Sequence, residues 1–170
     1  MIIRATQYLY RLSGVPSVKN TEEPPSPFPG EWYANFVERF DGRYNAIHFL
    51  HNPTRVSVLV PGPFLDQSIA GLRERAAALL MRKGYGRLLF QYGLLSPPEF
   101  YSTNSRSILA SMNQMRYEIE YHLSMPEINK ENNLDRIEDI EFETIIRTGK
   151  KLMDFTTPVR ILDELMSKFS

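Results

Sequence analysis

Four polar side chains near residue 110 have the residue types and the spacing of an anion-binding site. They fall at the start of one predicted helix and are Arg106, Ser107, Ser111 and Asn113. A guanidinium group binds phosphate or carboxylate through paired hydrogen bonds, and the first turn of a helix adds free backbone N–H groups. We therefore take these four residues as the candidate ligand-binding set. The alternative is that Arg106 pairs with a carboxylate or with strand-end carbonyls of the protein itself, and that the serines allow close packing.

A histidine and an asparagine form the candidate catalytic pair. The pairing of two predicted strands places Asn35 opposite His48, so that the amide could hold the imidazole as a general base. The alternative is an ordinary hydrogen bond between two half-buried strands. His51 follows His48 by three residues, but side chains at that spacing on a strand point to opposite faces. We therefore predict no metal site.

The common catalytic motifs are absent from the sequence. There is no cysteine for thiol chemistry or zinc binding, no G-x-S-x-G nucleophile turn, and no glycine loop of the kind that cradles phosphate before a helix. We therefore predict no cofactor. The sequence leaves open whether the protein is an enzyme.

The position of both candidate sets depends on a predicted strand hairpin. Segments 31–40 and 43–51 alternate in polarity and are joined by Asp41-Gly42, a dipeptide that favours a tight hairpin turn. Such a turn pairs residues whose numbers sum to 83, and a third strand at 56–60 continues the sheet. One face of this meander is then strongly apolar. Its side chains are Trp32, Phe36, Ile47, Phe49, Val56, Val58 and Val60.

Two main helices are predicted to cover that apolar face. Residues 61–84 carry an apolar stripe and have basic residues in the last turn before a glycine. Residues 105–123 carry a second stripe, which we interpret as core rather than as a cofactor site. Its members are Ile108, Met112, Met115 and Ile119.

The remaining segments complete the predicted fold class. Further strands are expected at 2–6, 87–95 and 99–104. We therefore predict an α+β fold with an antiparallel sheet of about five strands. The meander 31–60 lies at its centre, and two main helices pack on one face.

The chain divides by composition into a main domain and an extension. We predict a single α+β domain over 1–125, with a proline-rich loop at 15–30. Residues 126–170 form an acidic C-terminal extension that ends in a helix and packs on the same domain. The acidic residues of its centre are expected to form a solvated face. They are Glu138, Asp139, Glu141 and Glu143.

Composition limits the classes of function. The chain has 170 residues, 42% of them hydrophobic, and a formal net charge of zero, which argues against a wholesale nucleic-acid or membrane-surface binder. No apolar run approaches the roughly 18 residues that span a bilayer. The N-terminal segment also lacks the pattern of a signal peptide. We therefore expect a cytoplasmic protein without a membrane partner.

Two short motifs resemble a family of uncharacterised bacterial domains. "EWYAN" at 31–35 and "NSRSILASMN" at 104–113 are similar to the family patterns W-[YS]-A-N and N-R-S-[VI]-x-G-S-M-N, and "MIIRATQYL" is similar to the family's first strand. The chain departs from the pattern at Ser105, which is inserted before the arginine, and at Ala110, where glycine is usual. The resemblance covers about residues 1–125 and implies no assigned reaction. The positions it singles out are Trp32, Ala34, Asn35, Arg106, Ser107, Ser111, Met112 and Asn113.

Two hypotheses for the function follow. The first is a non-enzymatic interaction or accessory module with a protein partner, of the kind found with mobile elements, toxin–antitoxin pairs or defence systems. The second is an enzyme or binding domain for a phosphate-bearing ligand such as a nucleotide or RNA. In that case Arg106 and the helix start hold the anion, and His48 and Asn35 are the candidate catalytic residues.

Overall fold

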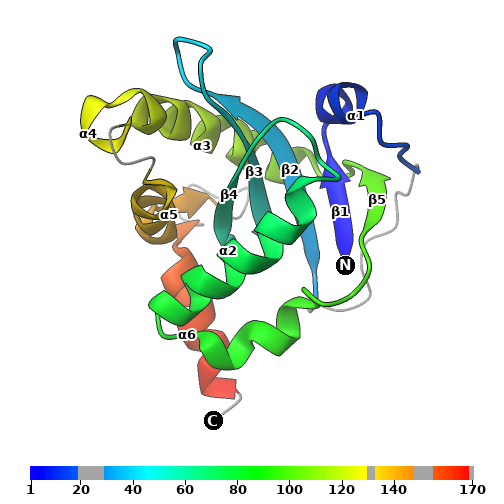
Figure 1. Cartoon of the computed structure of the whole chain (residues 1–170). Helices are drawn as coiled ribbons and strands as arrows, with labels where there is room; N and C mark the ends of the chain where they lie inside the picture. Colours follow the sequence, from blue (N-terminus) through cyan, green and yellow to red (C-terminus); the bar gives the residue numbers. More distant parts are fainter. Residues whose placement is uncertain (19–28, 130–132, 148–154, 169–170) are drawn as a thin grey trace.

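The computed structural model describes residues 1–18, 29–129, 133–147 and 155–168 (Figure 1). Most of the predicted proline-rich loop 15–30 lies outside these ranges. Within them, no helix combines the length and the apolar character needed to cross a bilayer.

A five-stranded sheet forms the centre of the molecule (Figure 1). Its strands lie in the order β4-β3-β2-β1-β5. The prediction of an α+β fold with about five strands is confirmed, but the prediction of an antiparallel sheet is wrong. β1 pairs in parallel with both β2 and β5, whereas β3 runs antiparallel to β2 and β4. The strands are β1 (Ile2–Ala5), β2 (Glu31–Glu38), β3 (Asn45–Asn52), β4 (Ser57–Pro61) and β5 (Glu99–Ser102).

Helices and one short ribbon complete the described chain. The segment predicted as a strand at 87–95 is instead a 3₁₀ helix, η1. Its buried residues are Leu88 and Tyr92, and Gly93 ends it in the left-handed region at φ 60°. The helices are α1 (Gln7–Ser13), α2 (Ser68–Arg82), η1 (Gly86–Tyr92), α3 (Arg106–Ser124), α4 (Pro126–Asn129), α5 (Leu134–Glu143) and α6 (Pro158–Lys168), and the ribbon consists of β6 (Ile146–Arg147) and β7 (Phe155–Thr156).

The predicted register of the meander is confirmed along all three strands. The pairs of β2 with β3 sum to 83, from Trp32 opposite His51 to Glu38 opposite Asn45. The backbone N–H of His51 donates to Val56 C=O at 2.9 Å, which fixes the third strand as predicted. The turn itself differs slightly, because Gly42 N–H donates to Arg39 C=O and the turn is centred on residues 40 and 41.

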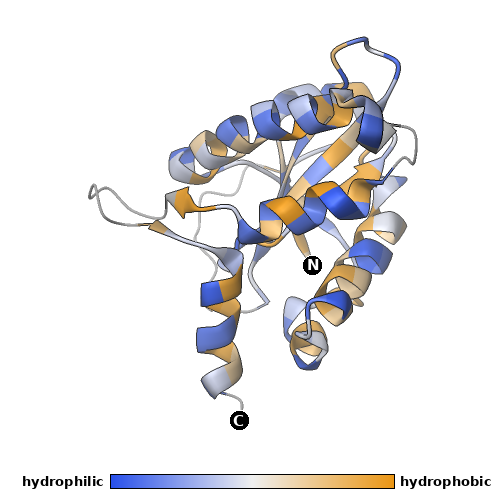
Figure 2. Ribbon diagram, turned by 90° about the vertical axis from the view of Figure 1, so that its left-hand side faces the viewer, coloured by the Kyte–Doolittle hydropathy of each residue, from blue (hydrophilic) through white to orange (hydrophobic). Residues whose placement is uncertain are grey.

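Helices cover both faces of the sheet, so the prediction of helices on one face only is wrong. α1 and α2 pack against the face that carries Trp32 and Phe49. α3 and α5 pack against the opposite face, where Tyr33 and Leu50 are also buried. Figure 2 shows the hydrophobic stripes of these helices. The second face is apolar enough to need this cover because both sets of alternating side chains in β2 and β3 are largely hydrophobic.

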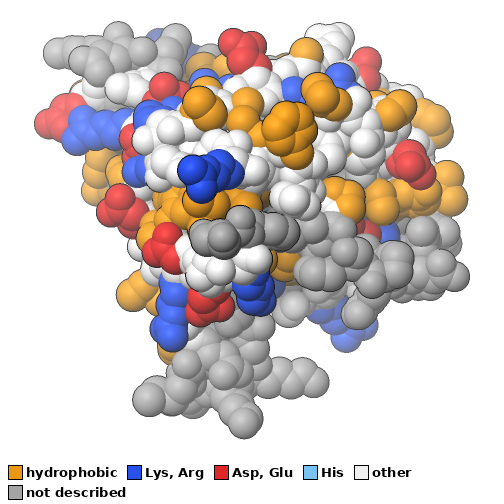
Figure 3. Space-filling model, turned by 90° about the horizontal axis from the view of Figure 1, so that it is seen from below, with side chains coloured by type: hydrophobic (Ala, Val, Ile, Leu, Met, Phe, Trp, Pro, Cys, Tyr) orange, Lys and Arg blue, Asp and Glu red, His pale blue; other side chains and the backbone are white. Residues whose placement is uncertain are grey.

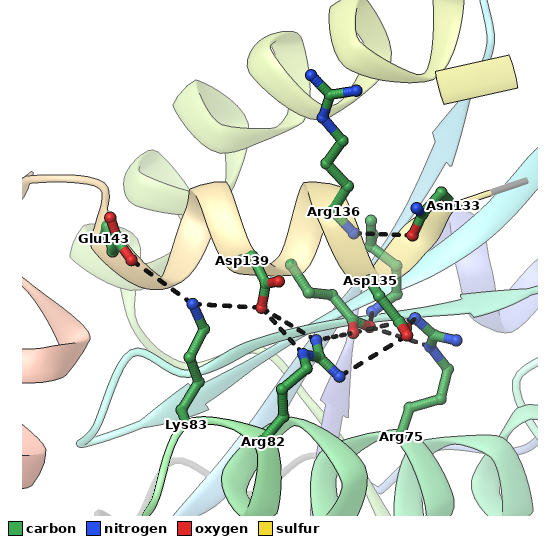
Figure 4. Close-up of polar contacts among 10 residues, drawn as sticks. Arg75, Arg82, Lys83, Asn133, Asp135, Arg136, Asp139 and Glu143 are labelled. Carbon is green, nitrogen blue, oxygen red and sulfur yellow. Dashed lines mark hydrogen bonds and ion pairs between the residues drawn. The ribbon is translucent and has the colours of Figure 1, made fainter. Parts of the chain in front are cut away.

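An array of ion pairs joins α2 to α5 (Figure 4). Glu138 lies at its centre, with 1% of its surface exposed. Its Oε1 accepts the guanidinium N–H of Arg75 at 3.0 Å and the backbone N–H of Leu59 at 2.8 Å, on the outer edge of β4. The prediction of a solvated acidic face is therefore wrong for Glu138. The other members of the array are Arg82, Lys83, Asp135, Asp139 and Glu143.

We expect Glu138→Ala to lower the free energy of unfolding by about 2–4 kcal/mol, because it leaves an edge N–H and a half-buried guanidinium without their acceptor. Glu143→Ala is the matched control. It removes an exposed carboxylate of the same array and should cost no more than about 0.5 kcal/mol. Urea unfolding measures both values, and equal losses in the two variants would contradict the role given to Glu138.

Candidate functional site

The four predicted ligand-binding residues all lie in the first half of α3 (Arg106–Ser124). Ser105 caps α3 by accepting the N–H of Ile108 at 3.4 Å, and Arg106 follows in the first turn. Arg106 is exposed and forms no ion pair with a described residue. Ser107 contacts the Ser105 hydroxyl at 3.2 Å, and Ser111 donates to the Ser107 carbonyl at 3.1 Å. Both serines are thus engaged in hydrogen bonds local to the helix.

His48 lies in the protein core. Its side chain is fully buried, and its Nε2 lies 2.6 Å from the Ser57 hydroxyl. Burial lowers the pKa of this imidazole to about 3, so it is neutral at ordinary pH. Asn35 stands opposite His48 in the sheet, as predicted, although no hydrogen bond joins the two side chains. Without exposed surface, His48 cannot reach a substrate as the candidate mechanism requires.

A polar cavity of about 310 Å³ does bring together two of the predicted residues, Asn35 and Asn113. We call it the edge pocket. It lies among α1, β2 and α3, and the other sequence-predicted site residues do not line it. Its lining residues are Thr6, Tyr8, Asn35, Phe36, Glu38, Asn113 and Arg116.

The edge pocket lies beside the end of β2, where the neighbouring strand β1 no longer pairs with it. Alternate residues of a strand direct their N–H and C=O groups to opposite sides. Arg39 N–H donates to Tyr44 C=O at 2.9 Å toward β3, so the even-numbered residues of β2 face β1. Thr6 N–H donates to Ala34 C=O at 3.1 Å, and the chain then turns away into α1.

Four residues further along β2, at Glu38, a side chain of α3 takes the place of a neighbouring strand. The backbone N–H of Glu38 donates to Glu120 Oε1 of α3 at 3.2 Å. Between Ala34 and Glu38, Phe36 directs its N–H and C=O to the same side, and neither group has a hydrogen-bond partner in the described chain. One donor and one acceptor are therefore left open.

Only some of the polar side chains of the edge pocket have a hydrogen-bond partner or an opposite charge. Asn35 is 5% exposed, and its Oδ1 has no hydrogen-bond partner in the described part of the protein. Arg116 donates from Nε to Glu120 Oε1 at 2.7 Å, which offsets its charge. Sequence reasoning missed Arg116, although it lies three residues after Asn113, a spacing that places the two side chains next to each other on a helix.

A second cavity, of about 390 Å³, lies between α2 and the segment after η1. We call it the apolar groove. Phe90 and Leu95 are each 88% exposed beside it, and hydrophobic side chains gather on the face seen from below in Figure 3. Sequence reasoning missed this feature because it assigned residues 87–95 to a strand. The lining residues are Arg73, Ala77, Leu89, Phe90, Gly93, Leu94, Leu95 and Ser96.

Arg73 is the charged residue of the groove. It donates from Nη2 to the Ser96 carbonyl at 3.0 Å. Its Nε is buried without a hydrogen-bond partner, and it forms no ion pair with a described carboxylate. The groove therefore combines an apolar wall with an unneutralised cation.

The other buried polar clusters hold strands together. Arg4 and Glu31, each 1% exposed, form an ion pair at 2.7 Å between β1 and β2. Arg4 also donates to the carbonyl of Ser102, the last residue of β5, at 2.9 Å. The Tyr33 hydroxyl bonds to Glu31 and to Asn104, and burial together with the Glu31 charge raises the pKa of Tyr33. This cluster ties three strands together and leaves no accessible reactive group.

Comparison with known proteins gives a family but no activity. The family described as Domain of unknown function (DUF6933) matches residues 2–161. The chain belongs to this family. The match runs past residue 125 and includes both the edge pocket and the apolar groove. No curated protein and no solved structure matches the chain.

The described residues contain no group of three or more histidine, cysteine, aspartate or glutamate side chains placed to hold an ion. Neither cavity has such a group in its lining.

Glu141 on α5 is buried without any hydrogen-bond partner for its carboxyl oxygens in the described chain. The prediction that it belongs to a solvated face is therefore wrong. Burial, and to a smaller extent the nearby Glu118 carboxylate of α3, raise the pKa of Glu141 to about 8. The carboxyl is thus mostly protonated at neutral pH.

This raised pKa predicts a pH dependence of stability. The folded state keeps the Glu141 proton at pH values where the unfolded chain has lost it, so the free energy of unfolding falls as pH rises from about 4.5 to about 8. Glu141→Gln removes this loss. We expect the variant to match the native protein at about pH 4 and to exceed it by about 2–4 kcal/mol at about pH 9.

Urea unfolding across this pH range measures the difference between the two proteins. The control is Glu164→Gln, which removes the same charge from an exposed site on α6 and should leave the pH profile unchanged. A difference between Glu141→Gln and native protein that does not vary with pH would contradict a buried, protonated carboxyl.

Proposed function

We propose that this domain is a non-enzymatic interaction module whose apolar groove receives a segment of a partner protein. The observation that carries the proposal is the pairing of two highly exposed apolar side chains, Phe90 and Leu95, with a groove of about 390 Å³. Contiguous apolar surface is costly to leave in water, and large patches of it mark interaction sites in soluble proteins.

The shape of the groove favours a side chain rather than a flat surface. Leu89 and Leu94 are less exposed than Phe90 and Leu95 and line its wall. A large apolar side chain that enters between them is removed from water on most sides. Such anchored side chains supply most of the binding energy of many interfaces.

Arg73 indicates the charge of the partner. A guanidinium without a carboxylate partner, placed beside an apolar wall, binds a carboxylate well because the surrounding apolar atoms weaken the competition from water. The partner segment is therefore expected to carry a large apolar side chain next to an Asp, a Glu or a C-terminal carboxylate.

A selection from a displayed library of random peptides tests this chemistry. We expect the selected peptides to share a large apolar residue next to a carboxylate. Phe90→Ser should weaken their binding by about tenfold or more through lost apolar contact. Arg73→Gln should weaken it by about tenfold through the lost charge-assisted hydrogen bond, as measured by calorimetry.

Met81→Ser is the matched control for Phe90→Ser. Met81 is also an exposed apolar residue, on α2, but it does not line the groove. Its substitution should leave peptide affinity unchanged. Selected peptides without a shared carboxylate, or an Arg73→Gln variant that binds them as tightly as the native protein, would contradict the proposed partner.

The second candidate function is binding of a phosphate-bearing ligand at the start of α3. It is supported by the exposure of Arg106 and by the lack of an ion pair between it and any described carboxylate. Of the two roles considered for Arg106, pairing within the protein has no support among described carboxylates.

Thermal unfolding with nucleotides and with inorganic phosphate tests this candidate. A ligand that binds only the folded state raises the melting temperature. If Arg106 holds the phosphate, the rise should be present in native protein and absent in Arg106→Gln, while the exposed neighbour variant Gln114→Ala keeps it. A rise of equal size in all three proteins would place the anion elsewhere.

A further inference from the structure

We propose that the edge pocket binds a small, neutral, planar heterocycle that presents adjacent N–H and C=O groups, as a nucleobase or a lactam does. The site is separate from the apolar groove and uses none of its residues. The juxtaposition that carries the proposal is an open strand edge at Phe36 beside the buried, unpartnered amide of Asn35.

At Phe36 the open edge offers one donor and one acceptor. At one end, Thr6 N–H already bonds to Ala34 C=O, and at the other the Glu38 N–H is bonded by Glu120. An extended peptide needs a longer run of free N–H and C=O groups to add as a strand. A ring with a single amide edge matches the one free pair at Phe36.

Two side-chain amides beside this edge offer further hydrogen-bond donors and acceptors to the same ligand. Asn35 is more than nine-tenths buried and lacks a partner for its Oδ1, and a buried polar atom without a partner is costly. Asn113 faces the pocket from α3 with a second amide. Amide groups both donate and accept, so they complement a ligand whose edge also does both.

Aromatic rings provide a surface for the plane of the ligand. Tyr8 of α1 lines the pocket and is 54% exposed. Its ring meets that of Phe36 edge to face, with centroids 5.7 Å apart. Exposed aromatic faces stack favourably on flat heterocycles.

The charges of the pocket favour a neutral ligand over an anion. Arg116 is the cation of the lining, and it is paired with Glu120 at 2.7 Å. Glu38 adds an unneutralised carboxylate to the same lining. A bare phosphate would meet a paired guanidinium and a negative charge, which disfavours it.

The size of the pocket favours a single ring system. Its volume of about 310 Å³ lies at the small end of the range of ligand sites, which runs from about 300 to 1,000 Å³. A one- or two-ring heterocycle can occupy such a space while its amide edge reaches Phe36.

Titration of the full chain followed by ¹H–¹⁵N NMR tests the proposal with uracil and hypoxanthine as probes. We expect saturable shifts at the amide of Phe36 and at the side-chain amides of Asn35 and Asn113. The N,N′-dimethyl derivative of uracil has the same ring but no N–H, and it should cause no shifts at these groups. Inorganic phosphate should also leave them unchanged.

Two variants of neighbouring residues on α3 complete the test. Asn113→Ala removes an exposed amide of the pocket and should weaken probe binding by about tenfold. Gln114→Ala removes an exposed amide outside the pocket and should bind as the native protein does. The proposal is overturned if neither probe shifts the pocket, if the dimethyl derivative or phosphate binds equally well, or if Asn113→Ala retains full affinity.

Discussion

The fold depends on one constraint, which is that β2 is apolar on both of its faces. Trp32 and Ala34 point to one side and Tyr33 and Val37 to the other, and all four are buried. Neither side can face water, so helices must cover both. The same constraint fixes the register of β2 with β3, because a shift of one residue would move every side chain of the strand to the other face. The register and the two helical layers are therefore consequences of the same alternating pattern.

Sequence reasoning could predict the meander because its signals are local. A tight turn next to Gly42 and the alternation of residues on either side fix the pairing without reference to distant parts of the chain. The parallel pairing of β1 has no such signal, since Ile2–Ala5 pairs with strands that begin only at residues 31 and 99. η1 was predicted as a strand because a short apolar run fits either structure until its packing is known.

The candidate sites were only partly predictable, for a similar reason. Asn113 of α3 and Asn35 of β2, both predicted as site residues, do line the same cavity, the edge pocket. The burial of His48 could not be inferred without knowing that α3 and α5 cover its face. Glu138 was predicted to be solvated because its partner Arg75 is 63 residues away in sequence, and the two residues meet only through the packing of α5 on α2.

The unpaired N–H and C=O of Phe36 differ from the other edge positions of the sheet. Exposed strand edges attract other chains, and folded proteins usually close them. Here Val18 covers the edge of β5, Glu138 accepts an edge N–H of β4, and Glu120 does the same for β2. Each of the two carboxylates forms an ion pair with an arginine, Glu138 with Arg75 and Glu120 with Arg116. A chain that closes three edge positions in this way leaves Phe36 open beside a cavity that also contains the buried, unpartnered Oδ1 of Asn35, and buried polar groups are rarely left unpaired. The open pair at Phe36 is therefore better explained as a place for a ligand than as an incomplete sheet.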